Sequence, residues 1–342
     1  MAQDIPMVYL ISSDAKAAAP PRVYEHCALH ARLFPLRPVR YEDLRRGSVR
    51  RLVGQLARPW VAAVPRPMPR RVWAMTCRAH AAALPSRRGG ADAAGARVCV
   101  FADLERLTDA ELAEARALWR RRRDAGLVSL NDPAHTLRRY DLLRTLHEHG
   151  VNRFAVHRLT DDVRPNRWPV FIRREDTHDG PETPLLRDRG ELDAAIERYR
   201  SDGRSWDNRI VVEYLDTIGG DGLYRKYGAF VIAGRVLPRH MLFSPRWMQK
   251  YSHELSDELM AEERRFVEDN PHERQLQRVA ELAGVDYGRI DYGVLDGGVQ
   301  VWEINTNPMI CVPELLAEGP RAAVHRGFMK RYHDALADLC GR

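Results

Sequence analysis

The spacing of apolar and polar positions predicts alternating strands and helices along the first part of the chain. Apolar runs at residues 8–11, 60–64 and 97–102 predict buried strands. The stretches 24–33 and 41–44 have the pattern of helices. Such alternation is typical of an α/β domain, in which helices pack on a largely parallel sheet.

A capping box marks the next helix. Thr108 is followed three positions later by Glu111, so that each side chain can bond the backbone of the other at a helix start. The helix is predicted to run to about residue 124, and Gly126 ends it. Residues 85–97 are rich in Gly, Ala and Arg and predict a loop. We assign residues 1–125 to the α/β domain.

The segment 126–208 contains apolar residues in both the helical and the strand pattern. Apolar residues recur at helical spacing before Gly150, which predicts a helix over about 137–149. The other elements predicted in this segment are strands at 127–130 and 168–175, a loop at 176–181 and a helix at 191–200.

Strand pairs dominate the segment 209–342. Asp296-Gly297-Gly298 is a turn sequence that tolerates positive φ, so the apolar runs beside it predict a hairpin over 289–304. We expect an α/β part followed by an α+β part. The other elements predicted are a strand at 210–216, a hairpin at 224–238 and helices at 254–270, 275–284 and about 320–339.

The hairpin at 289–304 carries candidate chemistry at one end. Strict alternation puts Val299, Val301, Glu303 and Asn305 on one face of the second strand. Asp291 lies on the first strand, so three oxygen-bearing side chains can converge. Carboxylate and amide oxygens suit Mg²⁺, which fills its shell with nucleotide phosphates and water. An ordinary edge hairpin with solvated acids is the alternative.

The order of these residues resembles a known family. Arg289-x-Asp291, a hairpin turn, and then a Glu-Ile-Asn-Thr-Asn-Pro string at 303–308 is similar to the metal-binding segment of ATP-grasp ligases. The resemblance implies an ATP-grasp fold in which Asp291, Glu303 and Asn305 hold Mg²⁺ against the phosphates of ATP. It also implies that Arg289 contacts the transferring phosphate.

The resemblance extends to a strand and loop that would bind the phosphates. The strand at 168–175 is similar to a family strand that ends in a phosphate-binding lysine, and Arg173 stands in the place of that lysine. The loop 176–181, which contains His178, would cover the triphosphate. A surface strand with solvated arginines is the alternative for Arg173.

The strand at 210–216 resembles the hinge whose backbone bonds the adenine edge in this family. The hinge residues here would be Glu213, Tyr214 and Leu215. A nearby acid would bind the ribose hydroxyls. The sequence leaves Asp216 and Asp221 as alternatives for that role.

Lysine is rare in this chain, which draws attention to Lys226 and Lys250. The helix at 137–149 has arginines where the family has a lysine, so one phosphate-facing cation is unassigned. Either Lys226 or Lys250 could supply an ammonium to the γ-phosphate. The alternative is that both are solvated lysines that persist in an arginine-rich chain.

Composition limits other classes of function. The chain is 44% hydrophobic, 30% charged and carries a formal net charge of +7. Arginines are spread along the chain without a known nucleic-acid motif, which argues against nucleic-acid binding. No run of about 18 apolar residues predicts a membrane helix, and the N-terminus lacks a signal-peptide pattern. Five scattered cysteines fit a reducing cytoplasm.

The function predicted is an ATP- and Mg²⁺-dependent ligase that joins a carboxylate to an amine through an acyl phosphate. Its substrates would be small molecules or peptides, and a homodimer is one possible assembly. Three alternatives stay open: an ATP-grasp phosphotransferase, a catalytically weak nucleotide-binding module, and a basic nucleic-acid-binding protein. We expect lobes at 126–208 and 209–342, the second with the metal site.

Overall fold

The computed structural model describes residues 8–12, 36–40, 98–177, 180–203, 206–248, 252, 255–308, 310, 319 and 321–340. The chain divides into two compact units. Unit 1 comprises Met1–Asp103, Leu107–Pro133 and Asn307–Arg342, and unit 2 comprises Leu104–Arg106 and Ala134–Thr306. The boundaries predicted from the sequence, near residues 125 and 208, stay a prediction.

Unit 1 is built on a parallel sheet with the strand order β2-β1-β3-β4. The strands are β1 (Val8–Ser12), β2 (Leu36–Arg40), β3 (Val98–Phe101) and β4 (Val128–Leu130). The helices α4 (Asp109–Asp124) and α10 (Ala322–Cys340) belong to the same unit. The α/β class is thereby confirmed for unit 1.

Local sequence determines where α4 begins. The Thr108 hydroxyl accepts a hydrogen bond from the Glu111 amide at 3.3 Å, and the Glu111 carboxylate accepts one from the Thr108 amide at 2.8 Å. Both halves of the predicted capping box are thus confirmed. Strand β2 was not predicted. The elements predicted at 24–33, 41–44, 60–64 and 85–97 lie outside the described residues.

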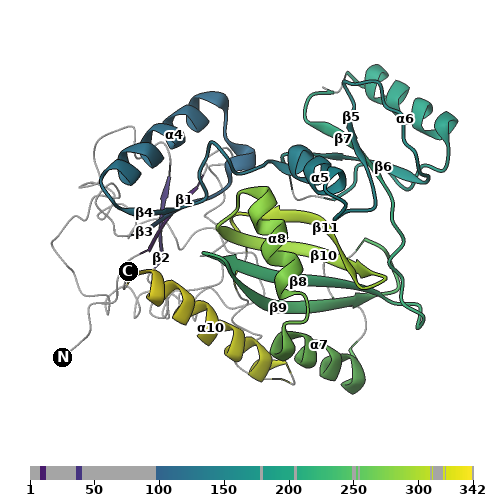
Figure 1. The fold of residues 1–342 in the computed structure, drawn as a ribbon. Coiled ribbons are helices and arrows are strands. Elements are labelled where there is room, and N and C mark those ends of the chain that lie inside the picture. Colours follow the sequence, from purple (N-terminus) through teal and green to yellow (C-terminus); the bar gives the residue numbers. More distant parts are fainter. Residues whose placement is uncertain are drawn as a thin grey trace, which may run out of the picture. The chain divides into compact units, whose positions relative to one another are not determined.

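Unit 2 contains a small antiparallel sheet with the order β5-β7-β6 (Figure 1). Its strands are β5 (Val156–Arg158), β6 (Val170–Arg174) and β7 (Arg209–Glu213), and α6 (Arg189–Ser201) follows β6. Alternate residues of β6 belong to different apolar clusters. Val170 and Ile172 pack with Leu192 of α6, whereas Phe171 packs with Phe154 in the other cluster.

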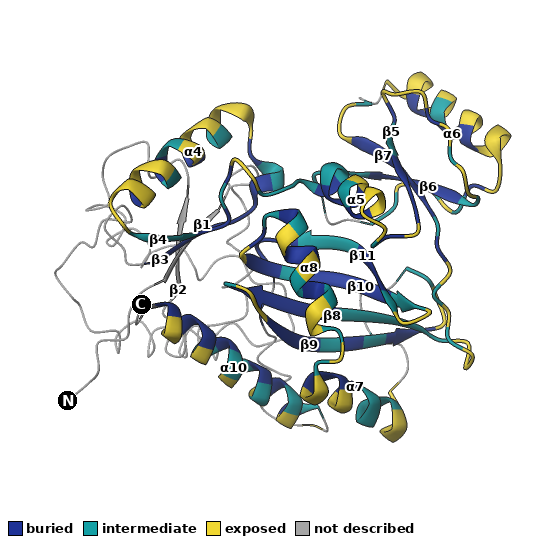
Figure 2. Cartoon of the chain, viewed as in Figure 1, coloured by how far each residue is buried: buried dark blue, intermediate teal, exposed yellow. Residues whose placement is uncertain are grey.

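A larger antiparallel sheet in unit 2 has the order β11-β10-β8-β9. Tyr227 and Tyr292 stack at 5.2 Å on its helix-covered face, where Phe266 also contacts Tyr227. Figure 2 shows these strands largely buried, while α8 turns an exposed stripe outward. The elements are β8 (Tyr224–Ile232), β9 (Arg235–Ser244), α7 (Asp257–Asp269), α8 (Glu273–Ala283), β10 (Tyr287–Leu295) and β11 (Gly298–Asn305), with α5 (Arg139–Glu148) preceding β5.

Most predicted elements of unit 2 are confirmed, including both hairpins and the α+β class. Strand β5 and the short 3-10 helix Leu104–Arg106 are described elements of unit 2 that the sequence did not predict. The turn of β10–β11 has φ of 50° at Asp296 and 75° at Gly297, as the turn sequence requires. Within the described residues, no helix is long and apolar enough to cross a membrane.

Strand β11 lies at the edge of its sheet, and a neighbouring loop caps that edge. The buried Asn152 side chain accepts a hydrogen bond from the Val301 amide at 2.8 Å and donates one to the Val301 carbonyl at 3.1 Å. The Gln300 side chain accepts from the Arg153 amide at 2.8 Å. The Asn152 contacts satisfy backbone groups of Val301 that an edge strand would otherwise leave unpaired.

We predict that Asn152→Ala lowers the free energy of unfolding by about 2–3 kcal/mol, because a buried N–H and C=O of Val301 lose their partners. Urea unfolding followed by circular dichroism measures this change. Arg153→Ala is the control, since its exposed ion pair with Asp296 should contribute less than about 1 kcal/mol. Equal effects of the two substitutions would show that the cap is not stabilising.

Candidate functional site

A β-bulge brings the polar residues of the β10–β11 hairpin to one face. Asp291 pairs with Glu303, but Tyr292 pairs with Val301, so Trp302 is an extra residue in β11. Paired residues share a face and successive residues of β10 alternate. Glu303 therefore lies on the face of Asp291, and Val301 lies on the opposite face. The prediction that Val301 and Glu303 share a face is wrong.

The bulge lets core and site residues meet at neighbouring positions. Arg289 pairs with Asn305, and because Arg289 is two residues from Asp291, both lie on the polar face. Tyr292 and Val301 are fully buried on the helix-covered face. The hairpin thus presents an apolar side to α7 and α8 and a polar side to the rest of unit 2.

Asp291 is fully buried and is held by two cations. The Arg289 guanidinium contacts its two oxygens at 2.6 and 3.0 Å, and the Lys226 ammonium lies 2.8 Å away. Burial alone would raise the pKa of Asp291, but the charges of Arg289 and Lys226 hold that pKa below its ordinary value. This carboxylate therefore stays ionised in the interior.

Glu303 is shared by two arginines from other elements. The Arg139 guanidinium lies 2.6 Å from Glu303 Oε2, and the Arg173 guanidinium lies 3.2 Å from the same oxygen. The side chains of Arg139 and Arg173 are only 4% and 9% exposed. One carboxylate thus joins the start of α5 to the end of β6.

Arg173 is not fully compensated by this contact. Burial and the nearby Arg139 charge lower the pKa of Arg173 to about 10. Its Nε–H is buried and has no hydrogen-bond partner among the residues that the structure describes. Buried donors are normally paired, so this orphan indicates a place for a ligand acceptor.

Arg139 also fixes the backbone at the end of β6. Its Nη1 donates to the carbonyls of Arg174 and Glu175 at 3.0 Å and to that of Thr177 at 2.5 Å. The resemblance left the phosphate-facing cation of this helix unassigned, and in the structure Arg139 of the helix contacts Glu303. One signal was available: a cation in the first turn of a helix opposes the helix dipole and needs another reason to be there.

The polar face of unit 2 carries more positive than negative charge. Among the described residues, four cations face two carboxylates, an excess of two positive charges in a largely buried place. Such an excess favours a polyanion, because its charge compensates what the carboxylates do not. The cations are Arg139, Arg173, Lys226 and Arg289, and the carboxylates are Asp291 and Glu303.

An aromatic cluster lies next to these charges. Phe171 packs in it two residues before Arg173 on β6, and the two side chains share a face. Phe154 stacks on Trp302 at 5.4 Å, and Trp302 directly precedes Glu303. On β6 the aromatic Phe171 thus comes before the charged Arg173, and on β11 the aromatic Trp302 comes before the charged Glu303.

The Glu213 side chain has a structural role. Its carboxylate accepts hydrogen bonds from the amides of Ala155 at 2.9 Å, Asn166 at 2.7 Å and Arg167 at 3.2 Å. The amides of Glu213 and Tyr214 themselves donate to carbonyls of the protein. The predicted adenine contacts of Glu213, Tyr214 and Leu215 stay a prediction, and the Glu213 carboxylate is engaged elsewhere.

The two candidate ribose acids have different surroundings. Asp221 is held by Arg225 at 3.0 and 2.8 Å, and this hydrogen bonding lowers the pKa of Asp221 to about 2. Asp216 accepts a hydrogen bond from the Tyr214 hydroxyl at 3.2 Å, and the same hydroxyl lies 2.7 Å from that of Tyr224. Only Asp216 of these two is connected to the predicted hinge by the contacts described.

Two predicted site residues, His178 and Lys250, lie outside the described residues. Lys226 lies among the described residues, and its ammonium contacts the Asp291 carboxylate. The role predicted for its ammonium stays a prediction. Gly228 makes room in the same row of the sheet: a Cβ built on it would lie 2.7 Å from the His240 ring, so a larger residue there would force that ring to shift.

The donor set on the polar face fits a hard cation. Two carboxylates and one amide oxygen, from Asp291, Glu303 and Asn305, share that face. Within the described part of the chain, no group of three His, Cys, Asp or Glu side chains forms a metal cluster. The fit therefore depends on Asn305 as the third oxygen donor, with phosphate oxygens and water completing the shell.

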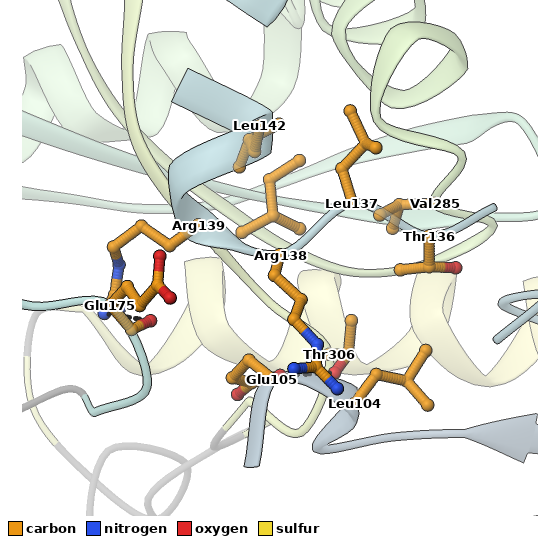
Figure 3. A pocket seen from close by; sticks show the side chains of 11 residues that line it. Leu104, Glu105, Thr136, Leu137, Arg138, Arg139, Leu142, Glu175, Val285 and Thr306 are labelled. Carbon is orange, nitrogen blue, oxygen red and sulfur yellow. Dashed lines mark hydrogen bonds between the residues drawn. The ribbon is translucent and has the colours of Figure 1, made fainter. Parts of the chain in front are cut away.

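A small pocket adjoins the start of α5 (Figure 3). Figure 3 shows Arg139 beside Glu175, and Arg138 directed toward Glu105. Burial raises the pKa of Glu175, whose Oε2 is buried without a hydrogen-bond partner among the described residues. The lining residues are Leu104, Glu105, Thr136, Leu137, Arg138, Arg139, Leu142, Glu175, Val285, Ile304 and Thr306.

No model of a protein family matches the sequence, and a search of curated proteins finds no match. Solved structures do resemble the chain. D-alanine–D-alanine ligase from Bacillus anthracis is 12% identical with a TM-score of 0.48, and the match covers 98% of this chain and 97% of that one. A RimK domain ATP-grasp protein from Sphaerobacter thermophilus is 14% identical with a TM-score of 0.43, over 98% and 100% of the two chains.

The ATP-grasp ligase PsnB, in complex with the precursor peptide PsnA2 and AMPPNP, is 16% identical with a TM-score of 0.48, over 99% of each chain. Two of these three structures, PsnB and the RimK domain protein, are described as ATP-grasp proteins. At these identities and TM-scores, any statement about function rests on the residues of the site.

We predict that Arg139→Ala lowers the free energy of unfolding by about 3 kcal/mol, because a buried ion pair and three backbone contacts are lost together. Denaturant unfolding measures the effect. Arg144→Ala, on the exposed side of the same helix, should cost less than about 1 kcal/mol. A similar cost for both would contradict the role given to Arg139.

Proposed function

We propose that this protein binds ATP against the polar face of β10–β11 and, with Mg²⁺, joins a carboxylate to an amine. The observation that carries the proposal is the Glu303 carboxylate shared by two buried arginines, together with the Arg173 Nε–H, which has no hydrogen-bond partner among the described residues. A polyanion with many acceptor oxygens supplies both the missing charge and the missing acceptor.

The order of side chains along β6 supports a nucleotide in particular. Phe171 and Arg173 lie on one face, about 7 Å apart along the strand. A flat apolar base suits the cluster around Phe171, and the phosphates suit Arg173 and Arg139. The hinge backbone after β7 would meet the edge of the base, and Asp216 would take the ribose hydroxyls.

Asp291, Glu303 and Asn305 would hold the metal. When bound, Mg²⁺ neutralises charge that passes between phosphate oxygens. The cations that pair with the two carboxylates are then available to the phosphates, whose negative charge compensates the excess positive charge of the site. In this arrangement Arg289 and Lys226 lie closest to Asp291 and orient the transferring group.

The reaction proposed has two steps. A substrate carboxylate oxygen attacks the γ-phosphorus of ATP, and the bond from that phosphorus to the bridging oxygen breaks. The products of this step are an acyl phosphate and ADP. The amine nitrogen then attacks the acyl carbon, phosphate leaves, and the amine gives up a proton. The chain contributes by positioning and by compensating charge, which is the main source of catalysis in phosphoryl transfer.

A screen of ADP release tests this function. The protein is incubated with ATP, Mg²⁺ and pairs of amino acids or short peptides, and ADP is measured. Release that requires both an acid and an amine supports a ligase. Release with one acceptor supports a phosphotransferase, and ATP binding without release supports a binding module. Salt-dependent oligonucleotide binding without ATP binding would favour a nucleic-acid-binding protein.

We predict that Glu303→Gln lowers the rate of ADP formation by about 100-fold or more, because the neutral amide holds the metal poorly. A titration with Mg²⁺ should show a higher concentration for half-maximal activity. Undiminished ADP formation would remove Glu303 from the site. Circular dichroism of the variant checks that the fold persists.

We predict that Arg173→Ala weakens ATP binding by about 1.5–3 kcal/mol, the contribution of a hydrogen bond to a charged group. Isothermal titration calorimetry measures the affinity. Arg174→Ala is the matched control, because this neighbour pairs with Asp176 and its side chain is 40% exposed. An ATP affinity that Arg173→Ala leaves unchanged would make Arg173 a structural ion-pair residue.

A further inference from the structure

Trp247 has no role in the proposed reaction. It nevertheless packs against the apolar cluster around Phe171, where the base of the nucleotide is proposed to bind. It belongs to the short segment that follows β9, where the Arg246 amide donates to the Ser244 hydroxyl at 3.0 Å. The side chain of Trp247 is partly buried against the cluster that contains Phe171 and Val212. Its indole is therefore available to a ligand that enters this cluster.

Two aromatic neighbours define the position of the indole. Its ring centroid is 5.1 Å from that of Phe171, at an interplanar angle of 50°. It meets the Tyr214 ring edge-on at 5.6 Å. Phe171 lies on β6 before Arg173, and Tyr214 directly follows β7, so Trp247 touches both elements that would surround a bound base.

The segment with Trp247 also reaches the loop that follows β6. A Cβ built on Gly180 would lie 3.9 Å from the Met248 sulfur, which is ordinary van der Waals contact. The residue after Trp247 is thus next to the loop predicted to cover the phosphates. A shift of this segment would therefore change the surroundings of both the base and the phosphates of a bound nucleotide.

The spacing of the rings leaves no room for a base between them. A planar base stacked between two rings needs centroids about 7 Å apart, twice the contact distance of carbon atoms. The centroids of Trp247 and Phe171 are closer than that. A base that lies on Phe171 must therefore displace the indole. The displaced indole can then stack on the free face of the base.

We propose that Trp247 occupies the base position when no nucleotide is bound and stacks on the adenine base when one is. This inference rests on the proposed function, because it needs a nucleotide in the site. A flat aromatic surface favours stacking with any planar heteroaromatic ring. Trp247 would thus determine how strongly the base, as distinct from the phosphates, contributes to affinity.

Inorganic tripolyphosphate separates the two contributions, because it has the phosphates of ATP without the base. Calorimetry with ATP and with tripolyphosphate, each with Mg²⁺, is applied to the wild type, Trp247→Ala and Trp206→Phe. Trp206 packs against the cluster on the other face of the small sheet and serves as the control. Trp247→Ala should lose at least about 5-fold in ATP affinity and keep its tripolyphosphate affinity.

Each outcome has a separate meaning. An ATP affinity that is unchanged or higher in Trp247→Ala overturns the stacking role. A parallel loss for both ligands also overturns it, since Trp247 would then support the fold of the phosphate site. If the wild type binds neither ligand, the proposed function itself fails. Nucleotide-induced change in tryptophan emission, lost in Trp247→Phe but kept in Trp206→Phe, is the supporting spectroscopic result.

Discussion

One carboxylate shared by two buried arginines holds the polar side of unit 2 together. Burying Glu303, Arg139 and Arg173 costs desolvation energy, which only close pairing and further hydrogen bonds offset. Arg139 meets this requirement by donating to three carbonyls as well as to Glu303. The Nε–H of Arg173 has no hydrogen-bond partner among the described residues, and we propose that a bound anion supplies it.

The bulge at Trp302 is the second constraint, because it decides which side chains reach this place. Without the extra residue, Glu303 would share the face of Val301 and would be buried among the aromatic residues under α7 and α8. With it, the strand packs an apolar side on the helices and turns Glu303 to the cations. The hairpin can therefore belong to the core and to the site at once.

The sequence predicted most elements of unit 2 because their patterns are local. Turn residues, caps and apolar alternation specify β10–β11, α8 and the β8–β9 hairpin without reference to distant residues. The same reasoning identified Asp291, Glu303 and Asn305 as a group. It failed at the bulge, because strict alternation has no means of detecting an inserted residue.

Other contacts depend on residues far apart in the chain. Arg139 and Glu303 are 164 positions apart, so their pairing follows from tertiary packing and not from a motif. The Glu213 carboxylate likewise accepts hydrogen bonds from three backbone amides, and no local sequence pattern predicts these contacts. Asp216 and Asp221 stay alternatives for the ribose contact from the sequence, and their neighbours in the structure differ: the Tyr214 hydroxyl donates to Asp216, whereas Arg225 pairs with Asp221.

The central claim is that the excess positive charge around Glu303 and Asp291 recognises the triphosphate of a nucleotide. Titration calorimetry of the wild-type protein with ATP and with adenosine, at the same Mg²⁺ and salt concentration, tests it directly. We predict that ATP binds at least about 100-fold more tightly than adenosine, since several charge-assisted hydrogen bonds go to its phosphates. Equal affinities for ATP and adenosine, or no binding of either, would contradict it.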